Sequence, residues 1–184
     1  MKSTLRNMTL SLTGLALAVA AVLGTVHMLT ERPIAEAAVK ARNDAMAEIL
    51  PPFDNDIAAT AAEVESITVY TARKGDTAVG YAAETYSDNG FGGRITVLVG
   101  FAADGSLTGY RVMSHAETPG LGAKMGEWFC QKGTNHDIIG TTAPVSVTKD
   151  GGSIDAITGA TITSRAFSEA INRARAAIFN NDRL

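Results

Sequence analysis

The segment RITVLVGFA, Arg94–Ala102, decides the fold, because apolar residues occupy every second position in it. The segment SLTGYRVMSH, Ser106–His115, continues with the same period of two after a turn at Ala103-Asp104-Gly105. Two such segments around a short glycine-containing turn are typical of an antiparallel hairpin. The middle of the sequence therefore predicts two adjacent β-strands.

Further pairs of segments extend this pattern in both directions. The period of two begins at Glu63, and the segments Glu65–Arg73 and Thr77–Tyr86 flank a turn at residues 74–76. They predict a hairpin upstream of the central one. The segments Ala143–Lys149 and Ser153–Thr158, joined across residues 149–152, predict a last hairpin downstream.

After the last of these segments the apolar period changes to 3.6 residues. This period predicts an amphipathic C-terminal helix that begins near Thr161, and a short helix is expected at Ala123–Gln131. Strands followed by a helix indicate the α+β class, with an antiparallel or mixed sheet. The apolar stripe of the C-terminal helix consists of Ile162, Ala166, Phe167, Ala170, Ile171, Ala174 and Ile178.

An uncharged stretch near the N-terminus predicts one transmembrane helix. No charged residue lies between Arg6 and Glu31, and Leu10–Leu29 supplies about the 20 apolar-leaning residues that cross a bilayer. A cleaved signal peptide is the alternative, although the stretch is long for one and no convincing A-x-A site closes it. Because Lys2 and Arg6 precede the span, the N-terminus is expected in the cytoplasm and the remainder outside the inner membrane.

These patterns predict four parts of the chain. Residues 31–50 have apolar residues at helical spacing, and Pro51-Pro52 ends that helix because proline disfavours helix before it and cannot donate. The predicted parts are a cytoplasmic tail at residues 1–9, a transmembrane helix at 10–30, a helical linker at 31–52 and a globular domain at 53–184.

Composition limits the classes of function. The 184 residues carry a net charge of −3, and all 19 acidic residues lie beyond residue 30. A mildly acidic globular part argues against a nucleic-acid partner, which requires a basic face. The single cysteine, Cys130, excludes an internal disulfide and a cysteine-based metal cluster within the chain, and it is expected to be a small buried residue.

The stretch DAITGATITS, Asp155–Ser164, joins a strand to the start of the C-terminal helix. One interpretation is structural: Thr161 is the N-cap of the helix and Gly159 forms the turn. The other is functional, because the free N–H groups at a helix start favour a bound phosphate, to which the Thr161 hydroxyl could be esterified. A threonine hydroxyl does not perform that chemistry unaided, so a separate modifying enzyme would be required.

A second stretch, SHAETPGLGAKM at Ser114–Met125, combines groups that suit a flat heteroaromatic ring. Glycine backbone can approach the face of such a ring, an apolar side chain can pack on it, and peptide N–H groups can meet its carbonyls. The lack of a third ligand nearby argues against His115 and Glu117 as a metal pair, and Glu117 is also a candidate general base. The candidate ring-binding residues are Glu117, Thr118, Pro119, Gly120, Leu121 and Gly122.

Together, HAETPGLG, the upstream GFGG at residues 90–93 and DAITGATITS resemble the FMN-binding domain of the G subunit of Rnf-type ion-translocating ferredoxin:NAD oxidoreductases. The same domain occurs in the C subunit of the sodium-pumping NADH:quinone reductase, which is longer. The resemblance covers nearly the whole chain. It implies FMN bound covalently through a phosphoester to Thr161, with Thr158, Gly159 and Ala160 completing the motif, and the Glu117–Gly122 loop at the isoalloxazine ring.

The resemblance also implies partners. A flavin transferase that uses FAD and a divalent metal makes the bond in this family, and the flavin-carrying protein transfers electrons between neighbouring subunits of a membrane complex. Nothing in the chain resembles a nicotinamide or iron–sulfur site, so no complete reaction is expected from it alone. The alternatives are a C-type subunit of the quinone reductase, another extracytoplasmic flavin carrier, and a membrane-anchored scaffold module without cofactor.

Overall fold

The computed structural model describes residues 5–180 and divides the chain into two compact units, Met1–Arg42 and Asn43–Leu184. Residues 1–4, which include Lys2 of the predicted cytoplasmic tail, lie outside the described residues. So do residues 181–184 at the end of the predicted globular domain.

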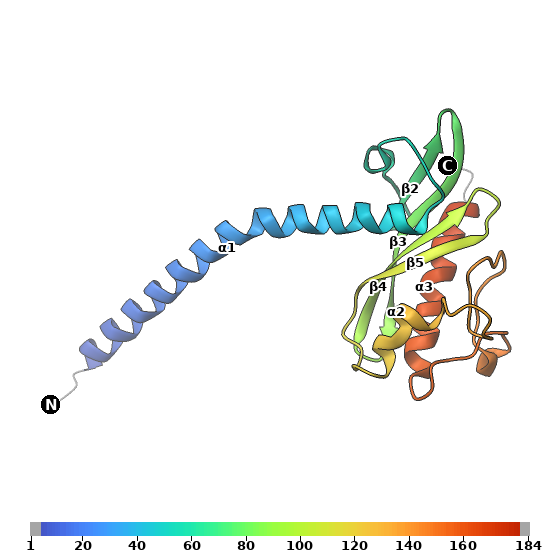
Figure 1. The fold of residues 1–184 in the computed structure, drawn as a ribbon. Helices are drawn as coiled ribbons and strands as arrows, with labels where there is room; N and C mark the ends of the chain where they lie inside the picture. The colour runs from blue at the N-terminus through green and yellow to red at the C-terminus, as the bar shows by residue number, and fades with distance from the viewer. Residues whose placement is uncertain (1–4, 181–184) are drawn as a thin grey trace. The chain divides into compact units, whose positions relative to one another are not determined.

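The first helix, α1, runs without interruption from Leu5 to Ile49 and includes Pro33 (Figure 1). Within the described residues it is the one helix long and apolar enough to cross a membrane, and its side chains are exposed from residue 5 to residue 41. The span and the helical segment after it, predicted from separate patterns, are therefore one helix. It ends before Pro51, as predicted from the inability of proline to continue a helix.

The second unit is built on an antiparallel sheet of five strands in the order β1-β2-β3-β4-β5. Each strand pairs with the next along the chain, which confirms the two central hairpins and the α+β class. The strands are β1 (Ala62–Val64), β2 (Ile67–Lys74), β3 (Thr77–Gly90), β4 (Gly93–Ala102) and β5 (Leu107–Ser114).

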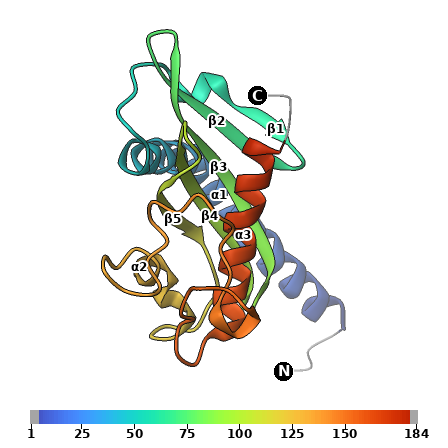
Figure 2. The same ribbon diagram turned by 90° about the vertical axis from the view of Figure 1, so that its right-hand side faces the viewer.

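Helix α3, Thr161–Phe179, covers one face of the sheet (Figure 2). Its buried side chains pack on alternate residues of the strands, and Phe167 is stacked on Phe129 with ring centroids 4.6 Å apart. The predicted C-terminal helix is thus confirmed in place and in its buried face. Ile162 is the exception, because it is half exposed and lies outside the core.

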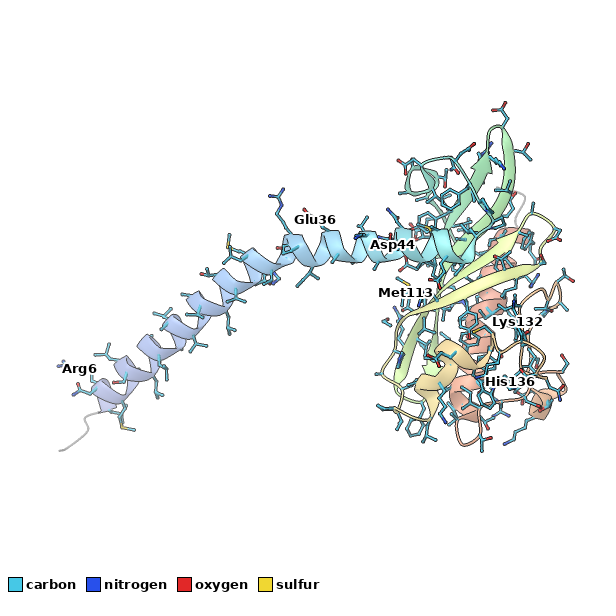
Figure 3. All side chains as sticks on the ribbon, viewed as in Figure 1. Arg6, Glu36, Asp44, Met113, Lys132 and His136 are labelled. Carbon is cyan, nitrogen blue, oxygen red and sulfur yellow. The ribbon has the colours of Figure 1, made fainter. Side chains whose placement is uncertain are left out.

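The last turns of α1 cover the opposite face of the sheet. Met46 and Ile49 are buried against Tyr70 and Leu98, whose side chains point away from α3. Met113, labelled on β5 in Figure 3, packs against the same cluster. Both faces of the sheet are therefore buried, which explains why β4 is apolar at almost every position.

The structure differs from the predicted strands in two places. Strand β1 was not predicted; it pairs with β2 across a tight turn in which Glu65 and Ser66 both have positive φ. The predicted last hairpin is wrong, because a single isolated bridge, Val147 to Ile154, is formed there. The short 3-10 helix η3 (Thr148–Asp150) interrupts the extended backbone between them.

Short helices connect the remaining parts. Helix η1 (Ile57–Thr60) leads into β1, and η2 (Gly122–Lys124) continues into α2 (Met125–Trp128), close to the short helix predicted at Ala123–Gln131. The Tyr110 hydroxyl on β5 donates to the Met125 carbonyl at 2.8 Å. Burial raises the pKa of Tyr110, so this phenol stays protonated and holds the loop after β5 on the sheet.

Candidate functional site

A cavity of about 370 Å³ lies where three loops meet at the start of α3. The β3–β4 turn contributes Phe91, the loop after β5 contributes four residues, and η3 contributes one. The lining residues are Phe91, Glu117, Thr118, Leu121, Gly122, Lys149, Gly159, Ala160, Thr161, Ile162 and Thr163. The two motif stretches, far apart in sequence, thus form one site.

The carboxylate of Glu117 connects the loop after β5 to two other parts of the site. Glu117 is only 4% exposed; its Oε1 accepts from the Gly92 N–H at 2.8 Å, and its Oε2 accepts from the Thr163 hydroxyl. A buried carboxylate requires such donors, because leaving it unpaired is costly. Glu117 therefore fixes its loop to both the β3–β4 turn and α3.

The glycines around Glu117 are explained by lack of space. A Cβ on Gly122 would lie 2.6 Å from the Thr163 hydroxyl oxygen, and a Cβ on Gly92 would collide with the Ala116 carbonyl. Neither glycine has a positive φ, so neither is needed for an unusual backbone conformation. Both are needed because only a residue without a Cβ lets these neighbouring atoms come so close. These glycines of the GFGG and HAETPGLG stretches thus permit the Glu117 contacts.

The turn before α3 leaves the Thr161 hydroxyl available. Gly159 has φ of +78°, Ala160 is the N-cap residue without a side-chain cap bond, and α3 begins at Thr161. The prediction that the helix begins at Thr161 is confirmed, whereas its interpretation as the N-cap is wrong. An N1 side chain does not point at the free N–H groups of its own helix as an N-cap does.

Ser164 stabilises this turn. Its buried hydroxyl accepts from the Ile157 N–H at 3.0 Å and donates to the Ala160 carbonyl at 2.9 Å. These two hydrogen bonds attach the backbone of residues 157–160 to the first turn of α3. The position of Thr161 at the cavity rim is therefore set by a buried hydrogen bond network.

Lys149 is the charged neighbour of Thr161. Its Nζ lies 3.3 Å from Thr161 Oγ1 and donates to it. The adjacent acid, Asp150, is bound by both nitrogens of the Arg165 fork at 2.6 and 2.7 Å, and this hydrogen bonding holds the pKa of Asp150 below its usual range. Asp150 is thus occupied by Arg165.

A second cavity adjoins the first on the other side of Thr161. Both are lined by Lys149, Gly159 and Thr161, and Thr158 lines the second one. The wall of the second cavity includes Trp128, whose indole is stacked on His136 with ring centroids 4.0 Å apart. The Thr161 hydroxyl therefore lies at the boundary between two hollows.

Most of the ten predicted site residues line these two cavities. Gly120 lines a different hollow, with Arg111 and Glu127, and Pro119 lines none of the three cavities described. Cys130 is exposed, so the expectation of a buried thiol is wrong. Its short loop places it at the surface, where its Sγ donates to the Glu127 carbonyl at 3.4 Å.

Four lining residues were missed by reasoning from sequence. Phe91 belongs to the quoted GFGG stretch. It is 70% exposed at the cavity rim, which indicates a ligand-binding role, but this exposure can be seen only in the folded structure. Ile162 was attributed to the core stripe, and Thr163 had no visible partner in sequence. Lys149 was part of a predicted hairpin turn, where a lysine carries no signal.

Comparisons with known proteins agree with this geometry. A family model described as FMN-binding domain matches residues 90–176, a range that contains every residue lining the first cavity. The G subunit of the ion-translocating oxidoreductase complex of Yersinia pestis is 34% identical over 95% of this chain and 90% of its own length. The G subunit of the Na⁺-translocating ferredoxin:NAD⁺ oxidoreductase complex of Acetobacterium woodii is 33% identical over 83% and 81%. The G subunit of the ion-translocating oxidoreductase complex of Erwinia tasmaniensis is 44% identical over 57% of this chain and 52% of its own length.

Proposed function

The chain belongs to the G subunit family of ion-translocating oxidoreductase complexes, and from this premise we propose that it carries one FMN covalently on Thr161. Its general role is flavin-based electron transfer within such a complex. The finer proposal is that the phosphate of FMN is esterified to Thr161 Oγ1 and that the protein relays electrons between neighbouring subunits. The observation that carries it is the available Thr161 hydroxyl at the rim of the first cavity.

The residues of that cavity fit a flavin. Phe91, Leu121 and Ile162 are exposed apolar side chains at its rim, at 70%, 44% and 50%, and such side chains pack well on a flat ring. A volume of about 370 Å³ is within the usual range for a cofactor pocket. We propose that Glu117, Thr118, Leu121 and Gly122 hold the ring, with Pro119 and Gly120 shaping their loop.

The tether has a physical purpose. FMN supplies the electron chemistry when bound, while the protein sets its position and surroundings. A cofactor that is lost outside the cytoplasm is difficult to replace, and an ester at Thr161 prevents that loss. The residues Thr158, Gly159 and Ala160 form the turn that presents the hydroxyl, because Gly159 adopts the positive φ that other residues avoid.

Attachment requires a partner enzyme. A threonine hydroxyl is a weak nucleophile without an adjacent base, so we propose that a flavin transferase, with FAD and a divalent metal, modifies Thr161. Thr161 is partly exposed and is therefore reachable for such an enzyme. Other subunits of the membrane complex would supply and accept the electrons.

The proposed topology follows from α1. An exposed apolar helix of this length suits a single membrane span, and Arg6 precedes the uncharged stretch, which favours a cytoplasmic N-terminus. We propose that residues 1–9 remain in the cytoplasm, that 10–30 cross the inner membrane, that the predicted linker at 31–52 connects the span to the FMN-binding domain, and that this domain faces the extracytoplasmic side.

Mass spectrometry of the native protein tests the attachment. Trypsin cleaves after Lys149 and Arg165 and releases one peptide that contains both Thr158 and Thr161. From cells that contain the transferase, this peptide is expected to carry the mass of FMN less one water, with fragment ions that place it on Thr161. Protein made without the transferase is the control and should give the bare peptide. A bare peptide from the intact, native complex would refute the proposal.

A reporter fusion tests the orientation. Alkaline phosphatase joined after the C-terminus is expected to be active, because that enzyme requires the oxidising extracytoplasmic environment to form its disulfides. A green fluorescent protein fused at the same place should be dark if exported in the unfolded state. The reverse pattern, with an inactive phosphatase and a fluorescent fusion, would show that the domain faces the cytoplasm.

A further inference from the structure

We propose that Lys149 holds the phosphate at Thr161: its ammonium binds the anionic oxygens of the ester and positions the phosphate for attachment. This inference rests on the proposed function and assigns a residue that neither motif contains. It begins from one contact, the 3.3 Å between Lys149 Nζ and Thr161 Oγ1. A group bonded to that oxygen would lie within reach of the same ammonium.

The charge of Lys149 is available for a ligand. Among the ion pairs of the described residues, none involves Lys149, and its hydrogen bond is to the neutral Thr161 hydroxyl. Asp150, the nearest acid in sequence, instead accepts from Nε and Nη2 of Arg165. A cation held at a hydroxyl without a carboxylate partner is suited to an anion that arrives with the ligand.

The two charges of the cavity also indicate how the cofactor lies in it. Lys149 lines the cavity on the η3 side of Thr161, and the carboxylate of Glu117 lies with Thr163 and Gly92. A phosphate is attracted to the first and repelled by the second. The ring, whose edge can donate through an N–H, is therefore expected on the side of Glu117.

The attachment chemistry gives the lysine a measurable role. The bond from Thr161 Oγ1 to phosphorus forms while the pyrophosphate bond of FAD breaks; AMP leaves with the bonding electron pair, and the hydroxyl proton passes to a base of the transferase or to solvent. Negative charge on the phosphate oxygens persists throughout. An adjacent ammonium stabilises that charge and orients the group.

The test compares flavin incorporation in purified full-length apoprotein with transferase, FAD and Mg²⁺. Lys149→Met, which keeps the length and removes the charge, is expected to incorporate flavin about tenfold more slowly, because one charge-assisted contact is lost. Lys149→Arg should restore most of the rate. Lys132→Met is the matched control, since Lys132 is an exposed lysine after α2 that lines neither cavity (Figure 3). Because Lys149 is exposed, these variants should unfold at the temperature of the wild type.

A second readout separates phosphate binding from a merely structural role. After complete loading, the ³¹P resonance of the ester is expected to shift in Lys149→Met and to stay in place in Lys132→Met. A normal rate in Lys149→Met, or a slow rate with an unshifted resonance, would overturn the proposal for Lys149. Thr161→Ala is run in parallel: if it remains unlabelled, the attachment site stands whatever Lys149 does, and if it becomes labelled, the proposed function itself fails.

Discussion

Thr161→Ala is expected to abolish covalent flavin, seen as complete loss of the fluorescent band on a denaturing gel under ultraviolet light. The substitution removes Oγ1, the oxygen to which the FMN phosphate is proposed to be esterified, so no partial labelling should remain. Thr161→Ser keeps that oxygen and should retain a fluorescent band. Thr158→Ala, in the same turn but lining only the second cavity, should retain one as well.

The loss should occur without unfolding. Thr161 is partly exposed, and its side chain bonds only to the exposed Lys149 among the described residues. Removing such a contact changes the free energy of unfolding by no more than about 0.5 kcal/mol. Equal thermal unfolding of Thr161→Ala and wild-type apoprotein would show that the fold survives. A fluorescent band in folded Thr161→Ala would place the flavin on another residue and refute the assignment.

The regular part of the fold could be predicted because its signals are local. Alternating apolar residues predicted β2 to β5, and the 3.6-residue stripe predicted α3, since both depend on which face of one element is buried. Strand β1 escaped because three residues are too few for a period. The false last hairpin had the right turn residues, but Asn172 on α3 binds both the N–H and the C=O of Val145, which a partner strand would have used.

The site residues that belong to a local sequence motif could be predicted, whereas those that reach the site through tertiary contacts could not. The Glu117 stretch was visible as glycines beside polar residues, and the Thr161 stretch as two threonines around a Gly-Ala pair before a helix. Their meeting in one cavity depends on Glu117 binding Thr163, a contact across 46 positions. Lys149 becomes significant only once η3 brings it to Thr161, so no local pattern could have identified it.

The two faces of the sheet explain why the end of α1 matters to the flavin domain. Met46 and Ile49 are 0% and 5% exposed, and they cover Tyr70 and Leu98. Glycines in the strands make room for this helix, since a Cβ on Gly100 would lie 2.7 Å from the Ile49 carbonyl oxygen. The division between the compact units accordingly falls after Arg42, earlier than the predicted boundary at residue 53.

A soluble fragment of residues 53–184 is therefore expected to be unstable, whereas 43–184 should fold. The shorter fragment lacks Met46, Ile49 and Leu50, and removing even one buried side chain of this size costs about 2–5 kcal/mol. A domain of this size has only about 5–15 kcal/mol in total, so the sum of such losses should prevent a cooperative transition in urea. In the full-length protein, Met46→Ala should lower the midpoint clearly, while Ala47→Ser, at an exposed neighbouring position, should not. Equal urea midpoints for the two fragments would mean that the end of α1 only lies on the sheet without stabilising it.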